Sequence, residues 1–249
     1  YMPSNPQVDN INGLPMINLR RIPLDNMANA FIKRAMDVVG ALVLIVLTSP
    51  LMLIAAVGVK LSSPGPVLFK QERVGRNKKP FYMYKFRSMR VNASEKTGWS
   101  RNEDPRKTPF GSFIRKFSID ELPQLANVVR GEMSLIGPRP LVYTEREIRF
   151  LRRWYGVYQV TPGITGWAQI NGRDTVDVYD KVYYDREYVQ HVSLKFDLKV
   201  IWKSIQVVLG RKGVVDGKID PEFRRESIVL LRESKIVERN ETPCGVSVE

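Results

Sequence analysis

The sequence contains very few of the residues that form disulfides or zinc sites. Its 249 residues include one cysteine, Cys244, and one histidine, His191. A single cysteine cannot form an internal disulfide or a cysteine metal cluster, and a single histidine lacks the partners for a histidine-based metal site or catalytic triad. The chain also lacks zinc-finger spacing, an RNA-binding signature and a convincing helix-turn-helix. These absences argue against a disulfide-stapled domain and against a nucleic-acid-binding protein.

Positive charge clearly exceeds negative charge along the chain. Lysine and arginine together number 39, against 26 aspartates and glutamates, which gives a formal net charge of +13. Such an excess implies an anionic partner: a nucleic acid, an anionic lipid or a phosphorylated substrate. Because nucleic-acid motifs are missing, we expect anionic membrane lipids and phosphorylated substrates, and no nucleic acid. The hydrophobic content of 43% suffices for one core with an attached membrane element.

Residues 38–59 form an apolar run without a charged residue. At ~1.5 Å per residue, a helix of this length just spans ~30 Å of hydrocarbon. Pro50 near its middle lacks an N–H and clashes with the carbonyl four residues back, while Ser49 can bond the freed carbonyl. Basic residues flank both ends, at Lys33, Arg34, Lys60 and Lys70. This symmetry does not fit the positive-inside rule, so we predict a re-entrant helix that turns at Ser49-Pro50 and returns to one anionic surface. A kinked single span is the alternative.

Two adjacent carboxylates, Asp120 and Glu121, open an apolar run with helical spacing. Ser118 stands three residues before Glu121, a spacing typical of a capping box, in which each side chain bonds the other residue's main chain. Asp120 would then lie in the first helical turn, where free N–H groups and the helix dipole favour negative charge. A carboxylate held ionised there can attack an electrophile or bind a metal ion. Acidic residues also occur in first turns because they stabilise helices, and that interpretation stays open.

Residues 67–74 and 81–89 are β-prone and bracket a basic turn, which predicts a β-hairpin. Alternation along the second arm would place Lys85 and Arg87 on one face. These two cations are candidates for contact with a phosphate. The alternative is a strand with a solvated basic edge.

Two further arginines are candidates for phosphate contact. Arg115 stands five residues before Asp120, close enough to face the same cavity. Arg139 lies in the Gly-Pro-Arg-Pro segment 137–140, which predicts a rigid turn. Its planar guanidinium suits a phosphate, and the flanking prolines reduce the entropy lost on binding. An ordinary turn with a surface arginine is the alternative.

The segment 162–173, PGITGWAQINGR, is rich in glycine but lacks the lysine–serine pair and the glycine spacing of a P-loop. The uncharged run, the block 85–89, the Asp120–Glu121 pair, the turn 137–140 and this segment resemble, in this order, the monotopic phosphoglycosyl transferases. These are bacterial sugar transferases that move a sugar phosphate from a UDP-sugar to a polyprenyl phosphate. The resemblance covers about residues 31–214 and is specific, because several unrelated blocks agree in order and spacing.

The resemblance implies a two-step reaction at the first membrane step of capsule, exopolysaccharide or O-antigen synthesis. Asp120 attacks the β-phosphorus and UMP leaves, and polyprenyl phosphate (undecaprenyl phosphate) then attacks the covalent phosphosugar–aspartate. Mg²⁺ bound by Asp120 or Glu121 would help neutralise phosphate charge. The expected catalytic and substrate-binding residues are Asp120, Glu121, Lys85, Arg87, Arg115, Arg139, Arg173 and Asp185, the last at a position that the family associates with the nucleotide sugar. The family also implies the inner (cytoplasmic) membrane, with the catalytic domain facing the cytoplasm.

We therefore expect an α+β fold, with a mostly helical membrane-associated domain, a small β-hairpin and an N-terminal re-entrant helix. The predicted parts are a linker or arm at 1–28, the membrane helix at 29–62, the catalytic domain at 63–214, and a C-terminal helix and tail at 215–249. Helices are predicted at 143–155, 175–190, 193–209 and 221–239, the second capped by Asp174. The basic helix 143–155 would lie on lipid headgroups. The helix 193–209 carries a lysine stripe and either lies at the membrane interface or packs on the core.

A competing hypothesis from another class is a non-catalytic, basic, membrane-anchored module that binds anionic lipid or polymer. It explains the charge and the apolar run, but not the carboxylate pair or the proline-fixed Arg139. The sequence names neither the sugar nor the glycan pathway, and it leaves a homo-oligomer open. Because Tyr1 is not an initiator methionine, the chain can also be part of a longer protein.

Overall fold

The computed structural model describes residues 7–11, 14–18, 22–90, 108–171, 177–210 and 221–241. The helices are α1 (Met27–Ser62), α2 (Pro109–Lys116), α3 (Gln124–Arg130), α4 (Arg146–Trp154), α5 (Trp167–Ile170), α6 (Val178–His191), α7 (Leu194–Gly210) and α8 (Pro221–Glu241). The strands are β1 (Gln7–Ile11), β2 (Leu14–Asn18), β3 (Leu68–Val74), β4 (Pro80–Phe86), β5 (Ser134–Ile136) and β6 (Gly163–Thr165). Short 3-10 helices occur at Pro23–Asp25, Arg76–Lys78, Ile119–Glu121 and Val157–Gln159. The expected mostly helical fold with little sheet is confirmed.

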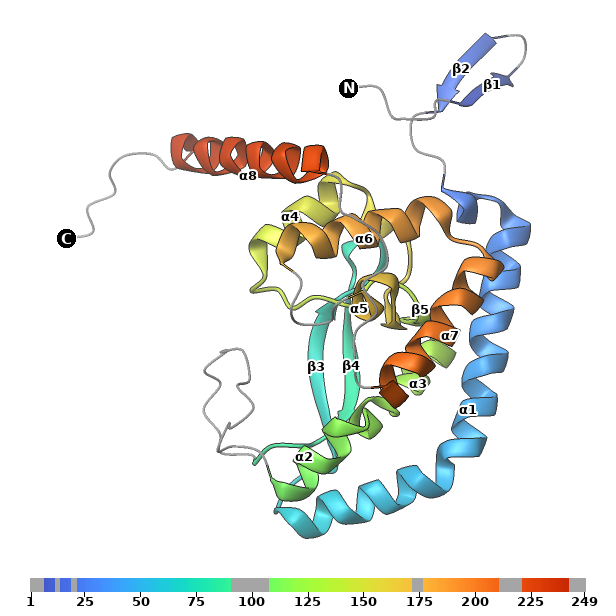
Figure 1. Ribbon diagram of the computed structural model, residues 1–249, viewed down its shortest axis with the longest axis vertical. Coiled ribbons are helices and arrows are strands. Elements are labelled where there is room, and N and C mark those ends of the chain that lie inside the picture. The colour runs from blue at the N-terminus through green and yellow to red at the C-terminus, as the bar shows by residue number, and fades with distance from the viewer. Residues whose placement is uncertain are drawn as a thin grey trace, which may run out of the picture.

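Helix α1 is a single helical element with Pro50 inside it, and Figure 1 shows it bent into two arms. Asn26 begins the helix, because its side chain accepts from the Ala28 N–H at 2.9 Å. Pro50 cannot donate to the carbonyl of Val46, and the hydroxyl of Ser49 donates to that carbonyl instead, at 2.8 Å. The predicted role of the Ser49-Pro50 pair in bending the helix is therefore supported, although the helix continues through the bend rather than breaking.

The outer surface of α1 is apolar and exposed. Val46 and Leu47 are each 71% exposed, and Leu53 is 68% exposed. Among the described residues, α1 is the one helix long and apolar enough to cross a membrane. A helix in the core of a soluble protein would be mostly buried, whereas 11% of the apolar segment of α1 is buried. Large exposed apolar patches mark surfaces that meet a membrane or a partner.

The inner side of α1 contacts the rest of the domain along both arms (Figure 1). Ala41 packs in a cluster with Met83 of β4 and Val128 of α3, and Val59 packs against Ile114 of α2. Arg34 donates to the carbonyls of Val128 and Val129 at 2.7 and 2.8 Å, and so bonds the C-terminal end of α3. The helix with the membrane-like surface thus directly holds the elements that carry the candidate site.

The predicted hairpin is confirmed as the antiparallel pair β3–β4, which pairs Leu68 with Phe86 and Val74 with Pro80. Figure 1 shows the two strands side by side through the middle of the molecule. A second antiparallel pair, β1–β2, lies within the segment that was predicted as a linker or arm. Strands β5 and β6 are parallel and bring the segment before Gly137 next to the glycine-rich segment.

Helices α4, α6 and α8 pack together around one apolar cluster. The predicted helix 143–155 is observed as α4 and the helix 221–239 as α8, which packs on α4 and α6 through Phe223 and Leu231. Helix α6 begins later than predicted, because Asp177 rather than Asp174 caps it, accepting from the Tyr179 and Asp180 N–H groups. Asp174 lies outside the described residues.

Helix α7 packs on the core, one of the two alternatives that the sequence left open, and a position at the membrane interface stays a prediction. Val200 is fully buried in the core, whereas Leu198 and Trp202 are 55% and 65% exposed. Two lysines of the predicted stripe, Lys199 and Lys203, lie over the ring of Trp167 at 4.9 and 5.3 Å. The helix therefore packs on the core and also presents an exposed apolar face.

Candidate active site

Asp120 and Glu121 lie in a 3-10 turn between α2 and α3, not in the first turn of an α-helix. The predicted capping box is wrong. Ser118 adopts a left-handed conformation with φ of 56°, and its side chain makes no capping hydrogen bond. Non-glycine residues in this conformation cost energy and often occur at functional sites. The turn carries both carboxylates inward, because the helix α3 that follows it packs on α1 and β4.

Glu121 is held by two cations from distant parts of the sequence. Its Oε1 atom lies 2.9 Å from Lys85 Nζ, at the end of β4, and 3.0 Å from Arg139 Nη2. Burial alone would raise the pKa of Glu121, but Arg139 and Lys85 outweigh that effect and lower it to about 2. Glu121 is therefore ionised throughout the physiological range, and three of the predicted site residues lie together.

Asp120 has the opposite electrostatic environment from its neighbour. It is 8% exposed, and burial together with the charge of Glu121 raises its pKa, while Lys85 and Arg115 act against this rise. Two adjacent carboxylates whose environments move their pKa values apart are suited to different tasks. Arg115 of α2 belongs to this group through its electrostatic effect on Asp120.

The turn 137–140 presents Arg139 toward this cluster. Both flanking prolines are buried, whereas the Arg139 side chain is 46% exposed. Arg139 is more exposed than Lys85 and Glu121, at 17% and 18%, so an incoming anion can reach it. The sequence predicted the turn, and the structure places its arginine at the carboxylate pair.

Asp185 lies in the interior rather than at the surface of the cluster. It is 1% exposed, and its Oδ2 accepts from Arg152 Nε at 2.8 Å. Burial raises the pKa of Asp185, and Arg152 opposes this rise. Arg152 is also buried, so this arginine of helix 143–155 does not face headgroups, and contact of the helix with headgroups stays a prediction. A role for Asp185 in direct contact with the nucleotide sugar stays a prediction.

Arg87 does not join Lys85 at the cluster, although the two were predicted to share a face. Strand β4 ends at Phe86, and Arg87 turns toward the end of α1, where its Nη2 donates to the carbonyl and hydroxyl of Ser63 at 2.5 and 2.9 Å. It thereby binds the C-terminal end of the membrane-like helix. Its predicted contact with phosphate remains untested, and Arg173 lies outside the described residues.

Sequence reasoning missed Asn127, a polar residue that supports the site. The side chain of Asn127 in α3 is fully buried and bonds two main-chain groups of β4. It donates to the Tyr82 carbonyl at 2.8 Å and accepts from the Tyr84 N–H at 3.1 Å. It fixes α3 against β4 next to Lys85. The sequence signal was weak, because an asparagine inside a short helix is compatible with an exposed position.

The carboxylate pair fits Mg²⁺ that binds together with a phosphorylated substrate. Within the described ranges, no group of three or more His, Cys, Asp or Glu side chains could hold a metal ion. Mg²⁺ often binds through one or two carboxylates plus substrate phosphates and water, so a dedicated protein cage is not required. The low pKa of Glu121 keeps a hard anionic ligand available at any physiological pH.

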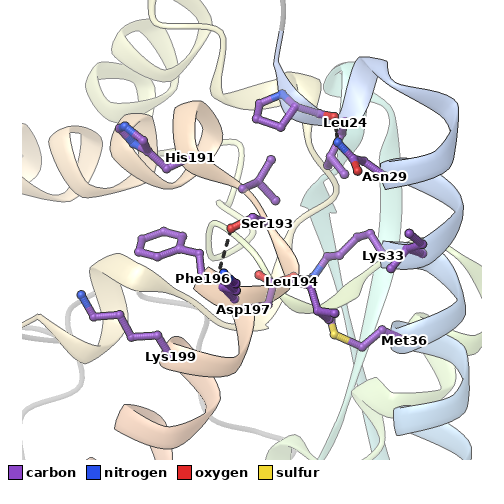
Figure 2. A pocket seen from close by; sticks show the side chains of 14 residues that line it. Leu24, Asn29, Lys33, Met36, His191, Ser193, Leu194, Phe196, Asp197 and Lys199 are labelled. Atoms are coloured by element: carbon purple, nitrogen blue, oxygen red, sulfur yellow. Dashed lines mark hydrogen bonds and ion pairs between the residues drawn. The ribbon is translucent and has the colours of Figure 1, made fainter.

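A cavity of about 620 Å³ opens elsewhere, between the start of α1 and the connection from α6 to α7. Figure 2 shows Lys33 and Met36 of α1 facing Phe196 and Asp197 of α7 across it. Lys33 Nζ lies 2.8 Å from Asp197 Oδ2, so an ion pair closes part of its wall. None of the predicted site residues that the structure describes lines this cavity, and the candidate active site therefore rests on the carboxylate cluster.

Comparison with known proteins identifies the family. The chain matches the family model described as bacterial sugar transferase over residues 28–211. It is 41% identical over 207 residues to the UDP-glucose:undecaprenyl-phosphate glucose-1-phosphate transferase of Escherichia coli K12, covering 80% of this chain and 44% of the relative. It is 46% identical over 190 residues to an Aeromonas hydrophila UDP-N-acetylgalactosamine-undecaprenyl-phosphate N-acetylgalactosaminephosphotransferase, covering 72% of this chain and 44% of the relative.

A third relative has a different length. An uncharacterized sugar transferase of Bacillus subtilis strain 168 is 42% identical over 189 residues, and the match covers 74% of this chain and 90% of that relative. The chain thus spans less than half of the first two relatives and most of the third. The matched segment contains α1, the hairpin and the carboxylate cluster. The chain belongs to the bacterial sugar transferase family.

Proposed function

We propose that this chain transfers a sugar 1-phosphate from a UDP-sugar to a membrane polyprenyl phosphate through a covalent aspartyl intermediate. The observation that carries the proposal is a pair of adjacent carboxylates in different environments. Burial and the charge of Glu121 disfavour the ionised form of Asp120, whereas Lys85 and Arg139 hold Glu121 in its ionised form. Relatives named for UDP-sugar:undecaprenyl-phosphate transfer support the substrate class.

In the first step an Asp120 oxygen attacks the β-phosphorus of the UDP-sugar. The bond from that phosphorus to the bridging oxygen breaks, and UMP leaves with the bonding electrons. In the second step an oxygen of polyprenyl phosphate attacks the same phosphorus, and the Asp120 carboxylate leaves. Burial favours this role, because a poorly solvated carboxylate is a stronger nucleophile once it is ionised.

The cations around the pair reduce the repulsion between an anionic nucleophile and an anionic phosphate. Arg139 is accessible and offers a planar fork to the diphosphate, while Lys85 and Arg115 add positive charge near Asp120. Mg²⁺ would be held by Glu121, Asp120 or both, together with the diphosphate, and would supply further neutralisation of charge. Glu121 keeps Lys85 and Arg139 in place before substrate arrives.

The exposed surface of α1 provides the membrane contact that a lipid substrate needs. In this proposal α1 enters the inner membrane, turns at Ser49-Pro50 and returns to the cytoplasmic face, where basic residues meet anionic lipids. The packing of both arms of α1 on one domain supports this arrangement. The first arm packs on β4 and α3, and the second arm packs on α2. The catalytic cluster would then face the cytoplasm, where UDP-sugars are present.

The test of this function is UMP release by the purified protein in detergent or lipid nanodiscs. We expect release with at least one member of a UDP-sugar panel in the presence of polyprenyl phosphate and Mg²⁺, and loss of release when EDTA removes the metal. A Lys195→Met variant is a matched control, because this exposed lysine of α7 lies outside the cluster. A protein that binds anionic vesicles but releases no UMP from any UDP-sugar would instead be a non-catalytic membrane module.

The two ends of α1 are expected on the same side of the membrane. In a Cys244→Ser background, single cysteines at Ala28 and Pro64 should both resist a membrane-impermeant thiol reagent in intact cells and react after the cells are opened. Both residues are exposed, so packing does not block the reagent. In the same background Pro50→Ala is expected to straighten the helix and move one end to the outside. Opposite labelling of the two ends in the protein with Pro50 intact would establish a spanning helix.

A further inference from the structure

The main chain of the turn 137–140 is bonded at every residue. The Gly137 N–H donates to the Thr165 carbonyl at 2.9 Å, and the Pro138 carbonyl accepts from the Gly163 N–H at 3.0 Å. These two contacts come from β6 in the glycine-rich segment. A side chain at Gly163 would put its Cβ 2.1 Å from the Gly137 nitrogen, so glycine is required for this approach.

The carbonyls of Arg139 and Pro140 accept from arginine side chains. The Arg139 carbonyl accepts from Arg152 Nη1 at 2.6 Å, and the Pro140 carbonyl accepts from Arg73 Nη1 at 3.2 Å. Burial and the nearby charge of Arg139 lower the pKa of Arg73 to about 10, so Arg73 is still a cation at neutral pH. Arg139, whose side chain contacts Glu121, is thus held at its main-chain carbonyl by Arg152 of α4.

Arg152 is in turn oriented by Asp185 of α6. The Asp185 Oδ2 atom lies 2.8 Å from Arg152 Nε and 2.5 Å from Arg152 Nη2, which fixes the plane of the guanidinium. The remaining terminal nitrogen, Nη1, then points at the Arg139 carbonyl. Both side chains are at most 5% exposed, so water does not compete for these bonds.

The packing of α4 against α6 does not require this ion pair. Leu151 of α4 and Val182 of α6 are fully buried in one apolar cluster that already packs the two helices together. A buried ion pair often contributes no more stability than apolar residues of the same volume, because both charges lose their water. The feature that apolar residues would not reproduce is the directed hydrogen bond to the turn.

We propose that Arg152 and Asp185 are a positioning pair that sets the main chain of Arg139, and thereby the direction of its guanidinium at the diphosphate. The pair touches no reacting atom and acts through Arg139. This assignment rests on the proposed function for its kinetic consequence, but its structural consequence is independent of substrate. It also gives Asp185 a role other than direct contact with the nucleotide sugar.

The structural test is amide hydrogen exchange across the turn in the absence of substrate. In Asp185→Asn and in Arg152→Lys, exchange of the peptide covering residues 134–142 should become faster. Arg152→Lys keeps the charge but has no planar fork with which to bond both Asp185 and the Arg139 carbonyl. Tyr155→Phe is the matched control, because it removes a 3.0 Å hydrogen bond between the end of α4 and Ser227 without touching the turn. Unchanged exchange of this peptide in both pair variants overturns the proposal.

The kinetic test is a double-mutant cycle with Arg139→Gln. Each pair variant should lower kcat/KM for the UDP-sugar by about 10- to 100-fold, because a small misplacement of a substrate-orienting group has that effect. In the Arg139→Gln background the same substitutions should have almost no further effect, since the group they position is absent. Equal fold-losses in both backgrounds would show a general structural role and overturn the inference. Faster exchange at the turn in the pair variants, together with no UMP release by the wild-type protein, would refute the proposed function and leave the positioning role standing.

Discussion

The Asp120→Asn variant is expected to lose UMP release by several orders of magnitude while remaining at least as stable as the parent protein. A neutral amide cannot attack phosphorus usefully, and each ~1.4 kcal/mol of lost transition-state stabilisation costs a factor of ten in rate. Because burial raises the pKa of Asp120, the ionised side chain destabilises the folded state above that pKa. Removing its charge at neutral pH should therefore not lower the thermal midpoint.

The neighbouring carboxylate gives the matched comparison. The pKa of Glu121 is lowered to about 2, so its charge stabilises the fold above the unfolded pKa, and that stability is lost as the pH falls toward 2. Glu121→Gln should lower the thermal midpoint at neutral pH, because Lys85 and Arg139 lose their shared anionic partner. The two adjacent substitutions are thus expected to change stability in opposite directions. A larger loss of stability in Asp120→Asn than in Glu121→Gln would contradict this electrostatic assignment.

Lys33→Met is expected to destabilise the protein by about 3–5 kcal/mol, the range found when one partner of a buried ion pair is removed. Asp197 is fully buried and lies 2.8 Å from Lys33 Nζ, so the substitution leaves its charge without a cationic partner. Lys33 Nζ also donates to the Ile136 carbonyl at 3.1 Å, directly before the turn that carries Arg139. The variant therefore weakens the attachment of α1 at a point close to the active site.

The pH dependence distinguishes a lost charge partner from lost packing. Burial already raises the pKa of Asp197, and Lys33 opposes that rise, so removing Lys33 should raise this pKa further. At low pH Asp197 is protonated and neutral, and the deficit in thermal midpoint of Lys33→Met should shrink as the pH is lowered through the raised pKa. Thermal unfolding in detergent at pH 7.5 and pH 5 measures this. Lys33→Met with Asp197→Asn should recover part of the loss, and an equal deficit at both pH values would point to packing alone.

Local sequence patterns predicted the elements whose structure is decided within a few residues. The alternation around the basic turn predicted the β3–β4 hairpin, and the Ser49-Pro50 pair predicted the bend of α1. The capping box failed for a tertiary reason. Ser118 takes a left-handed conformation in the sharp connection between α2 and the Asp120 turn, and spacing alone does not reveal that connection.

The sequence predicted which residues belong to the site, but not which of them contact one another. Glu121, Lys85 and Arg139 were predicted from separate blocks, but no periodic pattern relates positions that lie on β4, a 3-10 turn and a proline-rich turn. Arg152 could not be assigned from sequence, because the helix α4 carries several arginines and only Arg152 is paired with Asp185 in the structure. The buried side of a basic helix is decided by what packs on it.

Mass spectrometry of the protein after incubation with its UDP-sugar and Mg²⁺, without lipid acceptor, tests directly whether Asp120 forms a covalent intermediate. We expect a sugar-phosphate adduct on the peptide that contains Asp120, stoichiometric release of UMP, and loss of the adduct when polyprenyl phosphate is added. Asp120→Asn should show neither adduct nor UMP, whereas Tyr155→Phe should behave as the parent protein. UMP release that requires both substrates together, with no adduct under trapping conditions, would rule out the covalent intermediate and favour direct transfer in a ternary complex.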